Sequence, residues 1–253
     1  MVTGAADIGG AAPGPVADSR RVPRPADRAR RTDPARRDLA GWTRRLVQLY
    51  LGLTLYGVSA ALQVRAALGL DPWDVLHQGI ALHTHRAIGT ISIAVGAVVL
   101  LAWIPLRQRP GLGTVSNVIV VGLALNETLA LLPTPTGLAA RIATLAAGIV
   151  LCGIATGMYI TARLGPGPRD GVMTGLALRT GRSIRLTRTA IELTVLAAGW
   201  LLGGSVGPGT VLFALAIGPL SQFFLRVLAI PVREPSAAGL SEVALDRSCP
   251  EPG

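Results

Sequence analysis

The chain has 253 residues, of which 50% are hydrophobic and only 15% are charged, well below the share of about 25% in soluble domains. All of its basic residues are arginines, which give a formal net charge of +10 and lie in a terminal tail and between apolar runs. Since membrane orientation explains such arginines better than nucleic-acid binding does, we predict a polytopic protein whose partner is the lipid bilayer, and exclude nucleic acid.

The apolar runs predict six membrane-spanning helices between two polar tails. Residues 1–42 are rich in Arg, Pro and Ala and lack an apolar core, so we expect a disordered basic tail, with a second disordered tail at 233–253. The spans, each close to the roughly 18–20 residues that cross a bilayer as a helix, are expected at 45–65, 88–106, 113–132, 139–162, 186–203 and 209–230.

Two segments between these spans, 72–84 and 168–180, read as helices of their own. At about a dozen residues each, or ~18 Å as a helix, they are too short to cross the membrane. We therefore expect them to be re-entrant or interfacial helices.

The arginines orient the six-span chain. Those that precede the first span, follow the second, surround residues 168–180 and close the last span all fall on one side. Only three arginines fall on the other side: Arg65, Arg86 and Arg141. By the positive-inside rule both termini are cytoplasmic. Five or seven spans would break this segregation.

An internal repeat relates the two halves at an offset of 96 residues. The segment GLDPWDVLHQGIALHTHRAI (69–88) aligns without a gap with GPGPRDGVMTGLALRTGRSI (165–184). Its shared structural positions include Gly69, Pro72 and Gly79 in one copy and Gly165, Pro168 and Gly175 in the other.

The repeat predicts the fold class. Residues 43–135 and 136–232 become two transmembrane repeats, each with three spans and one short helix. Because three is an odd number, the second repeat enters the membrane from the opposite face. We therefore predict an all-α integral membrane protein made of two inverted-topology repeats, an arrangement that recurs in secondary transporters.

The GLDPWDVLHQG stretch at 69–79 and its second copy resemble the YczE/YyaS/YitT family of bacterial integral membrane proteins, most closely its YczE-like members. The resemblance covers roughly residues 45–232, which is all but the tails. It implies a multi-span protein of the bacterial inner membrane. It brings no agreed activity and no established catalytic residues.

Polar residues in and near the short segments form the candidate site. Asp71 is expected to cap the helix that begins at Pro72, with Asp74 in its first turn, and a purely structural role for this cap stays open. Trp73 is expected to be an interfacial anchor. Alternatively, polar groups of both repeats meet and bind a small-molecule or ion substrate. The candidates are Asp74, His77, Gln78, Arg86, Asp170, Thr174, Arg182 and Glu192.

Simpler roles stay open for several candidates. Arg86 and Arg182 fit snorkelling anchors, and His77 fits an interfacial hydrogen-bonding group. Glu192 lies within the fifth span, where it either pairs with Arg188 one turn earlier or acts as a protonatable coupling residue.

Other polar residues lie near or within the spans. Gln63 and Tyr159 occupy equivalent places in the two repeats, and line a cavity or form bonds between helices. Cys152 and Cys249 form no disulfide framework.

No catalytic or cofactor motif is recognisable in the chain. Its three histidines lack a cysteine or carboxylate arrangement that would complete a metal site, and there is no phosphate-binding G-x-x-x-x-G-K-[ST] loop. We predict a protein that is not an enzyme and has no metal or cofactor.

The leading functional hypothesis is a small secondary transporter or channel-like protein of unknown substrate. The alternative is a non-transporting membrane scaffold or regulator of a membrane-associated biosynthetic system. Whether the chain forms a homodimer stays open.

Overall fold

The computed structural model describes residues 34–228, with side chains from residue 41 onward. Most of the first predicted tail and all of the second lie outside the described residues. The chain divides into two units, 1–41 and 42–253, and all contacts below belong to the second. Helix α2 (Pro34–Ala66) begins within the segment expected to be a disordered tail up to residue 42. Proline is well suited to a first helical turn, because its missing N–H would have no partner there.

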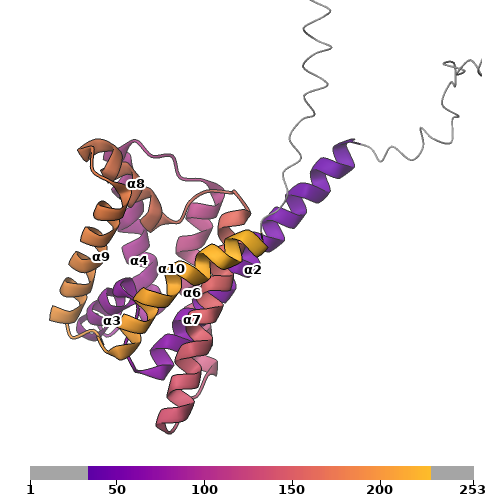
Figure 1. Ribbon diagram of the computed structural model, residues 1–253. Helices are drawn as coiled ribbons and strands as arrows, with labels where there is room; N and C mark the ends of the chain where they lie inside the picture. Colours follow the sequence, from indigo (N-terminus) through magenta and orange to yellow (C-terminus); the bar gives the residue numbers. More distant parts are fainter. Residues whose placement is uncertain (1–33, 229–253) are drawn as a thin grey trace, which may run out of the picture. The chain divides into compact units, whose positions relative to one another are not determined.

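Every regular element between residues 34 and 228 is a helix. After α2 follow α3 (Pro72–Thr84), α4 (Ile88–Leu101), α5 (Trp103–Leu106), α6 (Leu112–Leu131), α7 (Leu138–Thr161), α8 (Pro168–Thr180), α9 (Ile184–Leu201) and α10 (Pro208–Val227). The short helices α3 and α8 have the predicted bounds. In Figure 1, α8 and α3 lie at opposite ends of α9.

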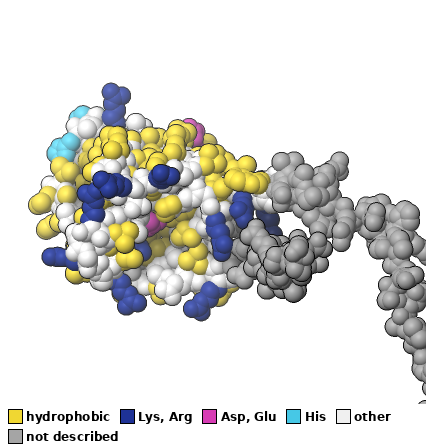
Figure 2. Space-filling view, turned by 90° about the horizontal axis from the view of Figure 1, so that it is seen from above, with side chains coloured by type: hydrophobic (Ala, Val, Ile, Leu, Met, Phe, Trp, Pro, Cys, Tyr) yellow, Lys and Arg dark blue, Asp and Glu magenta, His cyan; other side chains and the backbone are white. Residues whose placement is uncertain are grey.

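Five stretches of the described chain are long and apolar enough to cross a membrane: Gly41–Ala66, Ile88–Leu106, Leu112–Leu131, Leu138–Thr161 and Pro208–Val227. They coincide with five of the six predicted spans. Helix α9, at the sixth predicted span, has 18 residues but includes Arg185, Arg188 and Glu192. Figure 2 shows a face on which hydrophobic side chains are widely exposed and acidic ones are few.

The helix bounds of the two halves correspond at the sequence offset. Helices α3 and α8 both have 13 residues and begin 96 positions apart. The starts of α4 and α9, and those of α6 and α10, are also 96 positions apart. The preceding turns correspond as well. Gly69 has a φ of 116° and Gly165 a φ of 131°, values that only glycine adopts readily.

Two equivalent hydrogen bonds interlock the halves. The Gly113 N–H donates to the Leu164 carbonyl at 2.8 Å, and the Gly209 N–H donates to the Leu68 carbonyl at 2.8 Å. The short helices cross over in the same way, because α3 packs mainly against α9 while α8 packs against α4 and α5. Each half therefore depends on the other for its packing.

One helix pair breaks this correspondence. Helices α4 and α6 pack closely, and a Cβ at either Gly89 or Gly122 would collide with the backbone oxygen of the other glycine. The equivalent helices α9 and α10 make no comparable contact within the described chain, and a Cβ on Gly218 would meet no atom within 4 Å. The sequence supplies a reason, since Arg185 stands where the first half has Gly89.

Candidate functional site: a cavity between the two halves

A cavity of about 480 Å³ lies between the two halves and is lined by helices of both. Much of its wall is apolar, from side chains such as Val95, Val121 and Phe213. Its charged and titratable lining side chains are Tyr56, Asp71, His77, Tyr159, Arg169, Asp170, Arg188 and Glu192. The structure thus brings three of the predicted residues, His77, Asp170 and Glu192, to one cavity.

The start of α3 forms one side of the cavity. The Asp71 carboxylate accepts the backbone N–H groups of Trp73 at 2.8 Å and Asp74 at 2.9 Å, so the predicted N-cap is confirmed. Asp74 is buried and lies 3.0 Å, from Oδ1 to Nδ1, from His77. Asp74 does not line the cavity but stands behind His77, which it orients.

An arginine from α8 reaches the start of α3. Arg169 Nη1 lies 3.8 Å from Asp71 Oδ1, and its guanidinium carbon lies 4.9 Å from the centre of the Trp73 ring. Trp73 is only 8% exposed. The expectation that Trp73 is an interfacial anchor is therefore wrong, because the ring is packed inside the protein beneath a cation.

Sequence reasoning missed Arg169 as a site residue and counted it among the orienting arginines. Arg169 and Trp73 occupy equivalent positions of the two repeats. Because the two residue types differ, the alignment of the repeats gives no sign that they matter. Their contact across the two halves is a signal that only the fold reveals. The sequence predicts only a capping role for Asp71, because its second copy is Gly167 and the repeat therefore indicates no shared binding residue at this position.

The second half contributes two internal pairs to the cavity. The Tyr159 hydroxyl donates to Asp170 Oδ2 at 3.3 Å, and Arg188 Nε donates to Glu192 Oε1 at 3.0 Å. The pairing expected for Glu192 is thus present. Tyr159 was expected either to line a cavity or to form bonds between helices, and it lines the cavity.

Besides Asp74 and Arg182, three predicted residues lie away from the cavity lining. Gln78 Oε1 accepts the Ser205 N–H at 2.7 Å and so joins α3 to the loop before α10. The Thr174 hydroxyl donates to the Asp170 carbonyl of its own helix at 2.9 Å. Arg86 is exposed just beyond the end of α3.

The six proline and glycine residues shared by the two repeats have structural roles. Pro72 and Pro168 begin the short helices, and Gly69 and Gly165 shape the turns before them. The other two allow close packing in the middle of these helices: Gly79 against α9 and Gly175 against Leu106.

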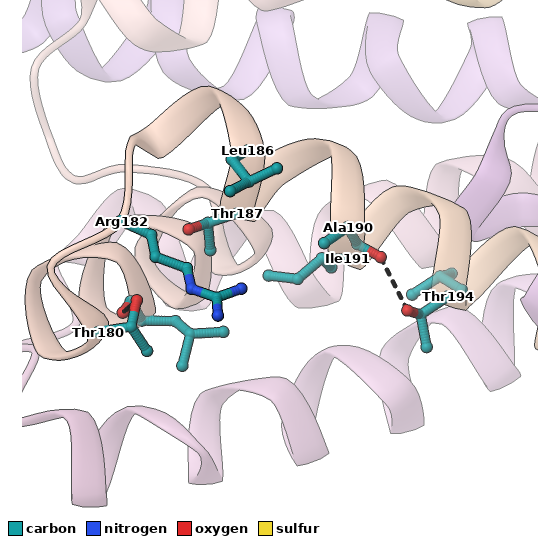
Figure 3. A pocket seen from close by; sticks show the side chains of 9 residues that line it. Thr180, Arg182, Leu186, Thr187, Ala190, Ile191 and Thr194 are labelled. Carbon is teal, nitrogen blue, oxygen red and sulfur yellow. Dashed lines mark hydrogen bonds between the residues drawn. The ribbon is translucent and has the colours of Figure 1, made fainter.

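Arg182 points into a different cavity, between α8 and α9, with a volume of about 640 Å³ (Figure 3). Leu176, Leu186 and Ile191 make most of that wall apolar, and Thr180 is among the hydroxyl residues that line it. The structure therefore separates Arg182 from the other candidates. Within residues 34–228, no group of three or more His, Cys, Asp or Glu side chains is placed to hold a metal ion.

Burial sets the protonation of the α3 groups. Burial and the charge of Asp74 raise the pKa of Asp71 to about 7, although Arg169 opposes the rise. Burial lowers the pKa of His77 by more than Asp74 raises it. At neutral pH His77 is therefore largely uncharged and donates to Asp74, while Asp71 exchanges a proton readily.

Comparison with known proteins places the chain among membrane proteins. Residues 43–226 match the model of a family of unknown function (DUF6198). An uncharacterized protein of Haemophilus influenzae is 45% identical over 72% of this chain and 83% of the relative. The uncharacterized membrane protein YczE of Bacillus subtilis is 33% identical over 67% of this chain and 79% of the relative.

The YyaS protein of Bacillus subtilis is 21% identical over 70% of this chain and 90% of the relative. No solved structure matches the chain. The matches to YczE and YyaS confirm the resemblance predicted from residues 69–79. Together with the five apolar helices, they show that the chain belongs to the family of unknown function DUF6198 and is a YczE-like multi-pass membrane protein.

Proposed function

We propose that this protein is a small secondary transporter or channel-like protein of the bacterial cell membrane, with its substrate site in the cavity between the two halves. The observation that carries the proposal is the cavity lining, where charged groups of both halves gather inside a largely apolar molecule. Ionisable groups at membrane depth are costly and usually mark a substrate or ion pathway. The proposal assigns them binding roles and no catalytic step.

The proposal includes two inverted-topology repeats of three spans. Helix α9 begins shortly after α8, and its last turns pack against α3, where a Cβ on Gly79 would lie 2.8 Å from the Gly199 carbonyl oxygen. A sixth crossing by α9 would join these two ends (Figure 1). Arg188 and Glu192 of α9 pair with each other at the cavity. This pairing lowers the free-energy cost of placing a helix with these charges in the membrane.

The unequal helix pairs support alternating access. Inverted repeats in transporters move against each other around a central site, so the two repeats hold different conformations at any one time. Here α4 and α6 are packed together, while α9 and α10 are apart. With six crossings both termini lie on one side, which the arginine distribution makes cytoplasmic.

Cysteine labelling tests the proposal without a known substrate. Ser92→Cys on α4 and Ser221→Cys on α10 would each place a thiol in the cavity lining, in a background with Cys152 and Cys249 replaced by serine. A membrane-impermeant maleimide should label both variants in right-side-out and in inside-out vesicles. Leu215→Cys, an exposed apolar position on α10 outside the lining, is the control and should stay unlabelled.

Labelling from one face only, or from neither, would contradict a transport pathway. It would favour the alternative of a membrane scaffold or regulator. That alternative also predicts a stoichiometric partner that co-purifies with the chain and is lost when the tails or the arginine-rich loops are altered.

A further inference from the structure

We infer that the cavity binds a small organic carboxylate at the N-terminus of α8, held by Arg169, and that Asp71 takes up one proton as the anion binds. This inference rests on the proposed transport function. It names the substrate class and the coupling ion of the same site.

The two short helices begin at the same cavity but differ in their caps. At α3 the Asp71 carboxylate accepts two backbone N–H groups. At α8 the equivalent residue is Gly167, and no side chain caps the helix. Helix starts carry unpaired N–H groups and a partial positive charge, which favour a carboxylate. A bound carboxylate would take at α8 the place that the Asp71 carboxylate takes at α3.

Arg169 has hydrogen-bonding capacity to offer such an anion. Its contact with Asp71 is 3.8 Å long, beyond hydrogen-bonding distance, and among the described residues none accepts a hydrogen bond from its guanidinium. A planar guanidinium binds carboxylates with two parallel bonds. The other cavity arginine, Arg188, already donates to Glu192.

A second unused donor lies beside Arg169. The indole N–H of Trp73 is buried and has no hydrogen-bond acceptor among the described residues. Leaving a buried donor unpaired costs free energy unless a partner arrives. The unpaired indole N–H and the guanidinium, which has no hydrogen-bond acceptor among the described residues, lie together at one side of the cavity. This arrangement indicates an acceptor ligand rather than a cation.

Asp170, in the first turn of α8, would lie beside the bound carboxylate, because its Oδ2 is 3.0 Å from the position that a Cβ on Gly167 would take. The first half shows that two carboxylates fit at one helix start, since Asp71 and Asp74 do so at α3. There His77 bonds Asp74. At α8 the Tyr159 hydroxyl donates to Asp170 in the corresponding way.

Charge balance in the cavity favours a proton as the companion of the anion. With Asp71 ionised, three lining carboxylates face two arginines, an excess of one negative charge. A bound anion would double that excess to two negative charges, and protonation of Asp71 would return it to one. Arg169, turning to the anion, would leave the Asp71 carboxylate without its cation, so that a proton from solution adds to it.

Asp71 is the group best placed to take up this proton. Because burial already brings its pKa to about 7, protonation costs little near neutral pH. The titratable and charged groups around Asp71 are Asp74 and His77 on α3, Tyr56 on α2, Cys152 and Tyr159 on α7, Arg169 and Asp170 on α8, and Arg188 and Glu192 on α9.

Binding and proton uptake are measured together on the purified full-length chain in detergent. Acetate, lactate and pyruvate are the carboxylate probes, acetamide the neutral one and ethylammonium the cationic one. We expect the carboxylates alone to raise the unfolding temperature. A pH indicator in weak buffer should report uptake of about one proton per bound anion at pH 8 and far less at pH 6, and affinity should fall up to about tenfold per pH unit above 7.

Variants assign these effects to residues. Arg169→Gln should lose the carboxylate response, and Arg169→Lys should retain a weakened one. Asp71→Asn should keep binding but lose proton uptake and its pH dependence. Gly167→Asp, which builds a carboxylate into α8, should block the probes. Arg182→Gln, in the other cavity (Figure 3), is the matched control and should behave as the unmodified chain.

Unchanged carboxylate binding in folded Arg169→Gln, or no carboxylate response in the unmodified chain, would overturn the inference. So would proton uptake that persists in Asp71→Asn. A response to ethylammonium or acetamide instead would overturn the anion class while leaving transport in place. The cysteine labelling from both faces decides the transport proposal separately.

Discussion

Asp71 combines two roles that single substitutions can separate, because its carboxylate caps α3 and also faces Arg169. Asparagine caps helices about as well as aspartate but carries no charge. Asp71→Ala loses both roles and should be less stable than Asp71→Asn by about 1 kcal/mol. Thermal unfolding of the two variants in one detergent checks this. Equal midpoints would show that the cap contributes nothing.

The raised pKa of Asp71 also makes the free energy of unfolding depend on pH. Between the ordinary carboxyl value of 3.8 and about 7, the native chain holds a proton that the unfolded chain has released. Stability therefore falls as pH rises through this range, by at most about 1.4 kcal/mol per pH unit, and the loss is complete above it. Unfolding midpoints at pH 5 and pH 7 should differ less for Asp71→Asn than for the unmodified chain.

At this scale the sequence predicted local chemistry and missed long-range contacts. The cap at Asp71 and the pair of Arg188 with Glu192 depend on neighbours in the chain, and spacing alone indicates them. The contact of Arg169 with Trp73 joins residues of different halves. Nothing in the sequence indicates this contact, because Trp73 and Arg169 are unlike residues that lie far apart in the chain.

Helix packing makes a second matched comparison possible, since Gly122 and Gly218 are equivalent positions in α6 and α10. A Cβ on Gly122 would meet the Gly89 carbonyl oxygen, whereas a Cβ on Gly218 would meet nothing within 4 Å. Gly122→Ala should destabilise the protein by about 1–3 kcal/mol through overpacking. Gly218→Ala should be neutral or stabilising by up to about 1 kcal/mol, because alanine favours a helix.

Denaturant or thermal unfolding of both alanine variants checks this comparison. Similar losses of stability would contradict the difference between the two helix pairs. The starts of α3 and α8 were predictable, since a proline begins each helix and the repeat places the two prolines 96 residues apart. The separation of α9 from α10 was not predicted, because the significance of Arg185 in place of Gly89 appears only once α4 and α6 are seen to cross at Gly89.

For the whole molecule, six crossings and the arginine distribution predict that both termini face the cytoplasm. A green fluorescent protein fused to the C-terminus should fluoresce, because it folds in the cytoplasm. Alkaline phosphatase fused after Ser205, in the loop between α9 and α10, should be active outside it. If α9 does not cross, the C-terminus lies outside and both fusion results reverse.

The difference between Gly89 and its equivalent Arg185 affects the relative free energies of the two states that a transporter with two repeats would adopt. In a transporter of the proposed kind, two identical halves would give two open states of equal free energy, related by a two-fold rotation. An arginine cannot enter the close crossing that Gly89 forms with Gly122, so the state with α9 and α10 together cannot match the state with α4 and α6 together. For the proposed transporter, this difference predicts a resting state in which α4 and α6 are packed together and α9 and α10 are apart.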